Sequence, residues 1–296
     1  MKKFLTLTLS LVLALVLVSS QASAQQFSKR KQYNTVGVSL NAMNYFGDIT
    51  PKPSIASFRF AATRPNIGLT FMHRFAPRIS VRGSLSYGRI TGDDAKAADD
   101  TDPEARYRFN RNMNFRNDIV EGAVVGVFDL IENRNNYLKR PDFVPYVFAG
   151  VAAFHHNPKG LDQNGNYIAL QPLGTEGQRA TGDQYGLWQF SLPFGGGVRY
   201  KLNKSFDLGL EIGWRKTFTD YLDDVSTNYV ANRNDLTPGA AQYFGYDITK
   251  GIDGTYSTAN QAGGQRGKSN EDDWYIVTGL SVNYILAPRI KSPKFR

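Results

Sequence analysis

Two neighbouring stretches between residues 188 and 217 alternate large apolar residues with small, polar or charged ones. The large residues of the first stretch are Trp188, Phe190, Leu192, Phe194, Val198 and Tyr200, and those of the second are Phe206, Leu208, Leu210, Ile212 and Trp214. A period of two residues is typical of a β-strand, in which successive side chains point to opposite faces. Only a short turn around Asn203 and Lys204 separates the stretches, so they predict a hairpin.

The length of the two arms restricts what this hairpin can be. Each arm runs for about 10 to 14 residues, roughly twice the usual strand of a globular protein and enough for the ~9 to 11 tilted residues that cross a bilayer. One face is apolar with aromatic residues near its ends, and the other is small or polar. The pattern therefore predicts a membrane-spanning hairpin with lipid on one side and a polar lumen on the other.

The first 24 residues have the pattern of a secretory signal peptide. Met1-Lys2-Lys3 is basic, the residues from Phe4 to Val18 are apolar, and Ala22-Ser23-Ala24 forms a small-residue cleavage site. We expect cleavage before Gln25 and a mature domain over residues 25–296. The chain has no Cys, which excludes disulfides and a lipid anchor on a cysteine.

Six further stretches repeat the alternation of the hairpin. Together they predict an all-β fold, an eight-stranded antiparallel transmembrane barrel, with strands at residues 35–45, 66–75, 79–90, 115–130, 145–155, 188–202, 205–217 and 273–286. Glu121 has apolar neighbours of both parities, so its facing stays open. A soluble eight-stranded barrel is the structural alternative, and the strand lengths and aromatic-rich apolar faces argue against it.

Long and short connections alternate along this series of strands. The links around Ala76-Pro77 and Asn203-Lys204 are short, and the link from Ile131 to Val144 is of moderate length, whereas the remaining links are long. Outer-membrane barrels have short periplasmic turns and long external loops. We therefore expect an integral protein of the cell outer membrane with both termini in the periplasm.

Basic residues gather on the side of the predicted short turns, where acidic residues are few. A basic rim attracts acidic protein surfaces or anionic lipid head groups. Both interpretations, partner docking and contact with the inner-leaflet lipid, stay open. The candidate partner-binding residues are Arg74, Arg78, Arg134, Lys139, Arg140, Lys201, Lys204, Arg289 and Lys291.

Charged residues also lie on the polar parity of several strands. Arg82, Arg199, Glu211 and Arg215 are expected to face the lumen, with Glu121 as a possible partner. Buried charges must be paired, and eight strands leave an interior that side chains about fill. We therefore favour a hydrogen-bonded plug over a pore lined by charge.

Few residues suit catalysis or metal binding. The chain has three His. The adjacent His155 and His156 point to opposite faces of a strand, and no Ser or Asp paired with a His stands out for a hydrolase. Asp220, Asp223 and Asp224 offer oxygen ligands, but their spacing does not match a calcium loop, and turn formation explains them better. We expect no enzyme activity, no cofactor and no metal site. Nucleic acid is excluded as a partner because an exported barrel does not meet it.

Four runs resemble one family of barrels. They are Gly209-Leu210-Glu211-Ile212-Gly213-Trp214-Arg215-Lys216-Thr217-Phe218-Thr219-Asp220-Tyr221-Leu222-Asp223-Asp224-Val225-Ser226, Leu192-Pro193-Phe194-Gly195-Gly196-Gly197-Val198-Arg199-Tyr200, Asn44-Tyr45-Phe46-Gly47-Asp48-Ile49 and Pro145-Tyr146-Val147-Phe148-Ala149-Gly150. The chain thereby resembles the PorG-like outer-membrane barrels of the type IX secretion system.

The resemblance implies a structural, non-enzymatic role. Barrels of this family associate with a periplasmic ring formed by a lipoprotein and its partner, and hold that ring to the outer membrane during protein secretion, which is coupled to gliding motility in some bacteria. The basic rim is the expected docking face, and the acidic run after Thr217 is expected to be an external structural loop. The alternative is a small ligand-binding or solute-conducting barrel that has no part in secretion.

Overall fold

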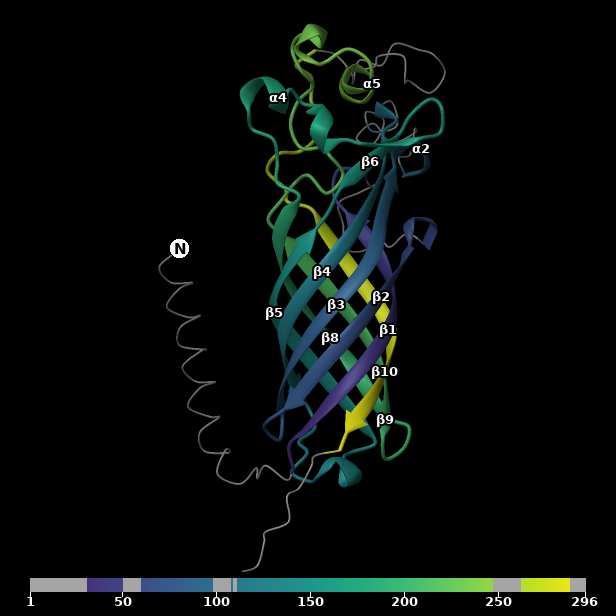
Figure 1. Cartoon of the computed structure of the whole chain (residues 1–296), viewed down its shortest axis with the longest axis vertical. Coiled ribbons are helices and arrows are strands. Elements are labelled where there is room, and N and C mark those ends of the chain that lie inside the picture. Colours follow the sequence, from purple (N-terminus) through teal and green to yellow (C-terminus); the bar gives the residue numbers. More distant parts are fainter. Residues whose placement is uncertain (1–30, 50–59, 98–107, 109–110, 247–261, 288–296) are drawn as a thin grey trace, which may run out of the picture.

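Eight long antiparallel strands close into a barrel in the computed structural model (Figure 1). The structure describes residues 31–49, 60–97, 108, 111–246 and 262–287. The predicted signal peptide and the basic residues Arg289 and Lys291 lie outside these ranges. The barrel strands are β1 (Tyr33–Phe46), β2 (Arg64–Arg74), β3 (Ile79–Asp93), β4 (Asn114–Asp129), β5 (Phe143–His155), β8 (Trp188–Lys201), β9 (Phe206–Thr217) and β10 (Trp274–Leu286).

Each barrel strand pairs with its neighbours in the chain, and the first strand also pairs with the last. The spatial order is β3-β2-β1-β10-β9-β8-β5-β4, and pairing of β3 with β4 closes the sheet. Every pair is antiparallel. The predicted fold class, an eight-stranded antiparallel barrel, is confirmed.

The outer surface of the wall is an apolar belt. Large side chains of the outward parity are exposed on all eight strands; they include Leu40, Leu69, Leu85, Val124, Val151, Phe190, Leu210 and Leu280. A monomeric soluble protein rarely exposes a contiguous apolar area of this extent, whereas a bilayer solvates it. The belt identifies a transmembrane barrel of the outer-membrane type, and the soluble alternative is rejected. Among the described residues, no helix is long and apolar enough to cross a membrane.

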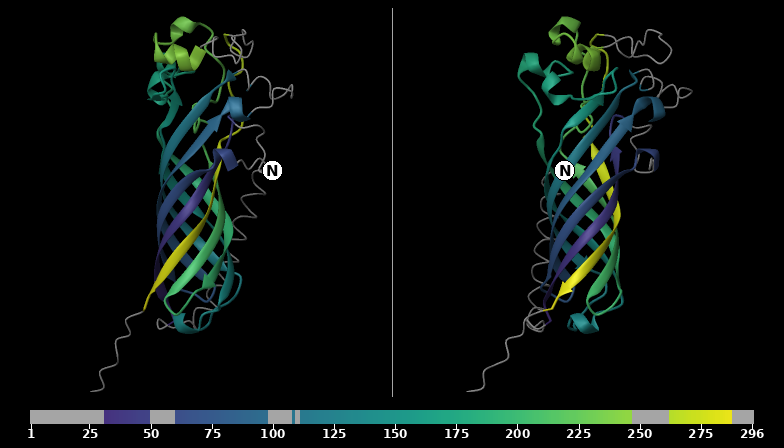
Figure 2. Two further views of the ribbon diagram at one scale, coloured as in Figure 1. Left: turned by 90° about the vertical axis from the view of Figure 1, so that its right-hand side faces the viewer. Right: turned by 45° about the vertical axis from the view of Figure 1, so that its right-hand side comes forward.

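The two ends of the barrel differ in size, as Figure 2 shows. The lower end holds the β2–β3 and β8–β9 turns and the β4–β5 link, which contains the 3₁₀ helix η2 (Tyr137–Lys139). The start of β1 and the end of β10 also lie there, where Asn34 pairs with Leu286. The upper end carries the longer links, which hold η1 (Phe60–Ala62), α2 (Asp94–Ala97), β6 (Pro158–Leu161), β7 (Tyr167–Ala169), η3 (Gln171–Leu173), α4 (Gln178–Thr181), η4 (Arg233–Asp235) and α5 (Ala240–Tyr246).

Glycines of β8 and β9 make room inside the barrel for an aromatic ring. A Cβ built on Gly195 would lie 2.9 Å from Cζ of Phe148, and one built on Gly213 would lie 2.7 Å from the same atom. Glycine in a strand often marks such a close approach. Phe148 packs with Val125, Val127 and Tyr146 in an apolar cluster inside the wall. This cluster also explains why β4 is apolar on both parities.

Candidate functional site: the barrel interior and its two closed ends

An ion pair between opposite walls crosses the middle of the lumen. Arg82 of β3 donates two hydrogen bonds to the carboxylate of Glu211 of β9, at 2.6 and 3.1 Å. The Tyr146 hydroxyl donates to the same carboxylate at 3.0 Å, and the Arg82 guanidinium lies 5.0 Å from the ring centroid of Phe148. A bidentate Arg–carboxylate pair fixes both side chains more firmly than a single contact.

Glu121 faces the lumen, which answers the question that the sequence left open. It is buried and accepts a hydrogen bond from the Tyr275 hydroxyl of β10. Nε of Arg215 lies 3.5 Å from the same carboxylate. The structure therefore brings Glu121 together with Arg215, and Arg82 with Glu211.

The other charged groups of the interior lie toward the lower end. Asp129, at the end of β4, contacts Arg74 at 2.6 Å and Arg199 at 3.4 Å. Arg140, in the β4–β5 link, contacts Asp207 at 2.7 Å and donates to the carbonyl oxygens of Asn203 and Lys204 in the β8–β9 turn. The link between β4 and β5 thereby folds across the lower opening and closes it.

These pairs leave little free space in the lumen. A polar cavity of about 70 Å³ remains near Arg82, Glu211 and Arg215, with room for only a few water molecules. Burying this many charges is favourable only when each has a partner, and the arginines and carboxylates described above are matched across the lumen. Paired charges and a small cavity favour the predicted plug over a charge-lined pore.

Two of the predicted partner-binding residues do not belong to the lower surface. Arg74 and Arg140 are both buried. Each forms an internal ion pair and donates hydrogen bonds to backbone carbonyl groups. Lys201 is half-buried beside Asp142, at 2.9 Å. Arg78 is half-buried and donates to the carbonyl of Leu130, whereas Arg134, Lys139 and Lys204 are exposed.

At the upper end, the acidic run after β9 turns into the barrel mouth. Leu222 and Val225 are fully buried in an apolar cluster with strand residues that include Met43, Phe115 and Phe154. Asn117 of β4 donates to the carbonyl of Leu222 at 2.7 Å. Residues 219–226 lie at the end that carries the long links, but they do not extend away from the barrel, because Leu222 and Val225 are buried in the mouth and the aspartates lie beside them. We call this segment, 219–226, the cap.

One tyrosine hydroxyl holds the cap to the first strand. Oη of Tyr45 lies 2.6 Å from Asp223 and 2.9 Å from Asp273. Asp223 also accepts from the backbone N–H groups of Ile49 and Val225, and Asp273 accepts from that of Leu222. The contact between Asp223 and the N–H of Val225 is a local turn contact of the kind that the sequence indicated. The other hydrogen bonds of Asp223 and Asp273 join residues that are far apart in the chain.

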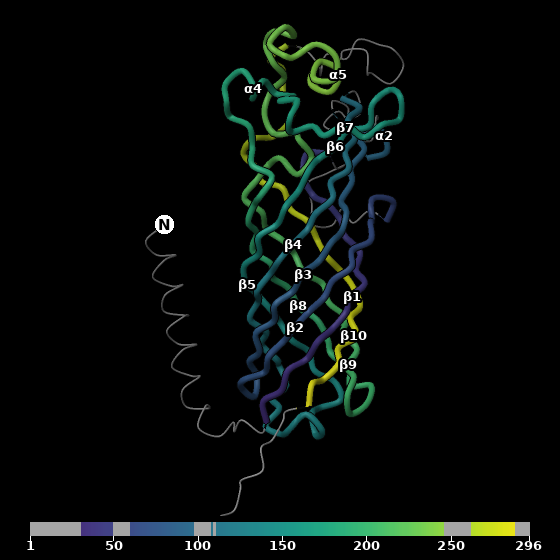
Figure 3. Tube along the Cα trace, viewed as in Figure 1, coloured from purple at the N-terminus to yellow at the C-terminus, as the bar shows by residue number. Residues whose placement is uncertain are grey.

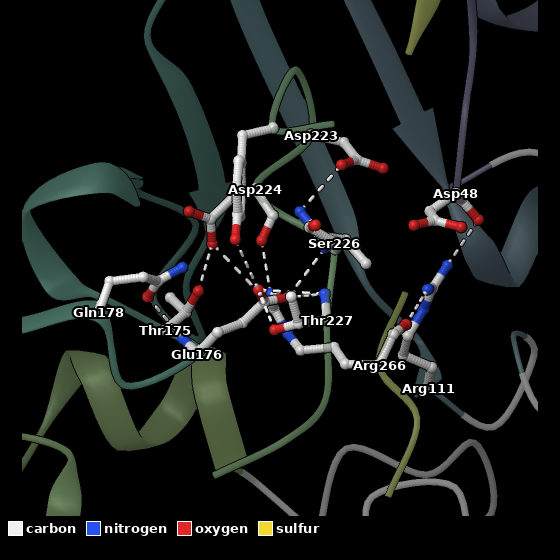
Figure 4. A network of polar contacts seen from close by, with 12 residues as sticks. Asp48, Arg111, Thr175, Glu176, Gln178, Asp223, Asp224, Ser226, Thr227 and Arg266 are labelled. Carbon is white, nitrogen blue, oxygen red and sulfur yellow. Dashed lines mark hydrogen bonds and ion pairs between the residues drawn. The ribbon is translucent and has the colours of Figure 1, made fainter. Parts of the chain in front are cut away.

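A second polar network joins the cap to two neighbouring loops (Figure 4). Glu176, before α4, accepts hydrogen bonds from the backbone N–H groups of Ser226 and Thr227 and pairs with Arg266 at 2.7 Å. Asp224 accepts from the hydroxyls of Thr175 and Tyr185, each at 2.6 Å. Its φ of 69° lies in the left-handed region, which Asp tolerates better than most residues. In Figure 3 the segments labelled β6, β7, α4 and α5 gather above the barrel strands at this end.

A second buried arginine, Arg111, joins the β3–β4 link to the neighbouring loops of the mouth. Arg111 donates to both oxygens of Asp94, at 2.7 and 2.8 Å, and to the carbonyl groups of Asp48 and Arg266. The mouth is therefore held by two fully buried arginines, Arg111 and Arg266, that reach backbone and carboxylate groups of different loops.

Burial changes the acidity of the cap. It raises the pKa of Asp223 to about 8, and the charge of Asp48 adds to the rise. Burial also raises the pKa of Asp220 to about 9, with Asp223 and Asp48 contributing. The pKa of Asp273 is raised for the same principal reason. Carboxyl groups in such an environment stay protonated at neutral pH.

The histidines and acidic clusters form no metal centre within the described ranges. His155 packs against the Trp188 ring, with centroids 5.3 Å apart, while His156 is buried and contacts Asn117 and the carbonyl of Gly186. Burial lowers the pKa of His156 to about 4, which keeps its ring neutral. Asp220, Asp223 and Asp224 contact different partners instead of converging on one point.

Several residues of the interior are not found by sequence reasoning. Asp129 and Asp207 lie at the ends of their strands. At such positions the alternation of residues does not distinguish a side chain inside the lumen from one at the rim. Glu176 and Arg266 lie in loops far apart in the sequence, so no spacing links them. The parity of Asp207 on β9 is the one available signal, because it matches that of Glu211.

Comparison with known proteins gives a family and no function. Among solved structures, the attachment invasion locus protein Ail of Yersinia pestis is 8% identical, with a TM-score of 0.40 over 86% of this chain and 99% of that chain. Neisserial surface protein A is 11% identical, with a TM-score of 0.38 over 85% and 96% of the two chains. A major outer membrane protein of Thermus thermophilus is 14% identical, with a TM-score of 0.38 over 86% and 99%.

The family assignment comes from the sequence. No curated protein matches the chain. A family model described as a domain of unknown function, DUF6089, matches residues 8–256. That match covers most of the sequence, and the chain therefore belongs to the DUF6089 family.

Proposed function

We propose that this protein is a closed, non-enzymatic barrel of the outer membrane that anchors the periplasmic lipoprotein ring of a type IX secretion system through its lower surface. The observation that supports this most is the combination of a lumen filled by paired charges with a lower end that exposes basic side chains. A sealed barrel acts through its surfaces rather than through a channel.

Of the predicted docking residues that the structure describes, five lie at the lower surface and two, Arg74 and Arg140, are buried. The five are Arg78, Arg134, Lys139, Lys201 and Lys204, which lie on the β2–β3 turn, the β4–β5 link, and the end of β8 with its turn. Among the described residues, no carboxylate lies within ion-pair distance of Lys139 or Lys204. These two lysines are the cations most available to an acidic partner.

The proposal is tested by charge reversal of the available lysines. The double variant Lys139→Glu with Lys204→Glu should lose the periplasmic ring components when the barrel is purified from native envelopes in mild detergent. The matched control reverses Arg179 and Arg233, which are exposed at the upper end. Unchanged recovery of the ring with the lower-end variant would exclude this docking surface.

The lipid alternative has its own signature in the same experiment. If the lysines serve only the inner-leaflet head groups, the double variant keeps the ring but binds anionic vesicles less tightly than the control. The solute-conducting alternative is separated by single-channel recording, because a plugged lumen gives no stable conductance.

A further inference from the structure

A cavity of about 400 Å³ lies against the outer wall of the barrel near its upper end. The upper ends of β1, β9 and β10 form its floor, where Phe46 pairs with Trp274 and Ile276 pairs with Trp214. Residues 270–272, just before β10, form its rim. The volume falls within the range of small-molecule sites, about 300 to 1,000 Å³.

The floor of this cavity continues the lipid-facing belt. Phe46, Trp214, Trp274 and Ile276 all have the outward parity of their strands, as do Ile212 and Leu280 further down the wall. Leu280 is 53% exposed, whereas Ile276 is only 4% exposed, so the surface becomes sheltered at this height. An acyl chain lying along the belt can therefore enter the cavity without leaving an apolar surface.

The lining holds one cation, Lys216, and three acidic residues. Glu271 and Asp272 are exposed at the rim, whereas Asp48 is buried and accepts a hydrogen bond from the backbone N–H of Lys268. The Lys216 ammonium lies 2.7 Å from Asp272 and 4.8 Å from the ring centroid of Trp274. Glu271 supplies the second carboxylate of the rim. The contact of Lys216 with Trp274 shows that the indole face accepts an ammonium group, as aromatic faces generally do.

The charges of the rim select among head groups. An amphiphile with only a phosphate meets two carboxylates that repel it, and one with only an ammonium group meets Lys216. A head group with both charges places its phosphate beside Lys216 and its ammonium group beside Glu271, Asp272 and the Trp274 face. Lys216 already pairs with Asp272, and Lys268 lies 4.0 Å from Glu271. A head group with both charges adds an opposite charge beside each of these pairs.

We propose that this cavity binds one membrane lipid whose head group carries both a phosphate and an ammonium group, with an acyl chain packed on Trp214 and Ile276. The site lies outside the sealed lumen and does not depend on the proposed role in secretion. Lipid binding here places a zwitterionic lipid beside the segment that leads from the cap into β10.

Native mass spectrometry of the full-length protein tests the proposal. The protein is reconstituted in nanodiscs with equal amounts of phosphatidylethanolamine and phosphatidylglycerol, and the lipid that remains bound after ejection is counted. We expect one retained phosphatidylethanolamine, enriched about fivefold over phosphatidylglycerol, which corresponds to about 1 kcal/mol. Equal retention of the two lipids, or preference for phosphatidylglycerol, would overturn the assignment.

Variants locate the binding to this cavity. The double variant Glu271→Gln with Asp272→Asn should remove the preference, and Lys216→Met should reduce retention of phosphatidylethanolamine. Arg179→Met, at an exposed position of α4 outside this lining, is the matched control and should leave both unchanged. Heat-dependent migration in detergent gels checks that each variant forms the barrel, and a preference that survives the double variant would place the lipid elsewhere.

A second measurement needs no variant. A phosphatidylethanolamine analogue with a photoreactive acyl chain should label peptides that contain Trp214 or the residues from Trp274 to Ile276. Labelling spread evenly around the belt would contradict a defined site.

Discussion

The hydroxyl of Tyr45 lies 2.6 Å from the carboxylate of Asp223, which joins residues 178 positions apart in the chain. The same hydroxyl lies 2.9 Å from Asp273. A phenol has one proton to donate, so at these distances one of the two carboxyl groups must supply a proton of its own. The cap is therefore closed by two protons, that of the phenol and that of one carboxyl group, which are shared among three buried side chains.

Removing that hydroxyl should loosen the cap without opening the barrel. We expect Tyr45→Phe to lower the free energy of cap opening by about 1–3 kcal/mol, since it leaves buried carboxyl groups without a partner. Hydrogen exchange in detergent should speed up at the amides of Leu222 and Val225 and stay unchanged in β4. Tyr200→Phe, on the outward-facing side of β8, is the control, and an equal effect of both substitutions would contradict the assignment.

The cap should become less stable as the pH rises. The pKa of Asp223 moves from 3.8 to about 8 on burial, so the closed cap holds a proton that the opened segment releases. Stability is then fully present below about pH 4 and declines as the pH rises toward 8; Asp220 extends the decline to about pH 9. The facing groups are Tyr45, Asp48, Asp273, Glu176 and Arg111.

This loss of cap stability is measured by hydrogen exchange at the cap amides, with the exchange rates corrected for the intrinsic effect of pH. The amides of β4 serve as the reference. Asp223→Asn, which is neutral at every pH, should flatten the profile. A cap that gains protection between pH 5 and 8 would refute the shared protons.

Arg266 should be essential to the upper closure. Arg266→Met leaves Glu176 and Asp224 buried without their cation, which typically costs about 3–5 kcal/mol. We expect limited proteolysis to cut between residues 219 and 227 in this variant while the barrel still migrates as a folded protein. Arg233→Met, at an exposed position of the same link, should show no new cleavage.

The Arg82–Glu211 pair should stabilise the barrel and block ion flow. Arg82→Ala leaves Glu211 without its cation, and we expect a loss of about 3–5 kcal/mol in urea unfolding from lipid vesicles. The double variant Arg82→Leu with Glu211→Leu should recover most of this loss, because it removes both charges. A double variant as unstable as the single one would show that the pair is not the main partner of either side chain.

Alternation along single strands is enough to predict the barrel. From Phe206 to Trp214 the outward-facing residues of β9 are all apolar, and such a period of two over a bilayer's width has few other solutions. The hairpin order of the strands follows from the link lengths. The lumen-facing side of Arg82, Arg199, Glu211 and Arg215 follows from parity alone.

The residues that are buried at the upper and lower ends of the barrel cannot be predicted from the alternation along single strands. The polar β4–β5 link predicts a surface position for Arg140, yet its guanidinium reaches four carbonyl groups and Asp207 inside the lower opening. The acidic run predicts a loop on the side of the long links but not the burial of Asp223, which follows from the apolar contacts of Leu222 and Val225 beside it. Loop burial depends on contacts between distant segments, and periodicity does not record them.

The pairing of β1 with β10 has a mechanical consequence. Tyr33 begins one strand and Leu286 ends the other at the same rim, and the two strands are paired from Asn34 to Phe46 of β1. A force that pulls Tyr33 at the start of β1 away from Leu286 at the end of β10 would break the hydrogen bonds between these strands one after another. It would not load all of these hydrogen bonds at the same time. A force that pulls the start of β1 and the end of β10 in the same direction acts on the whole barrel wall at once. A barrel held in a membrane resists this force better than one that separates the two strands.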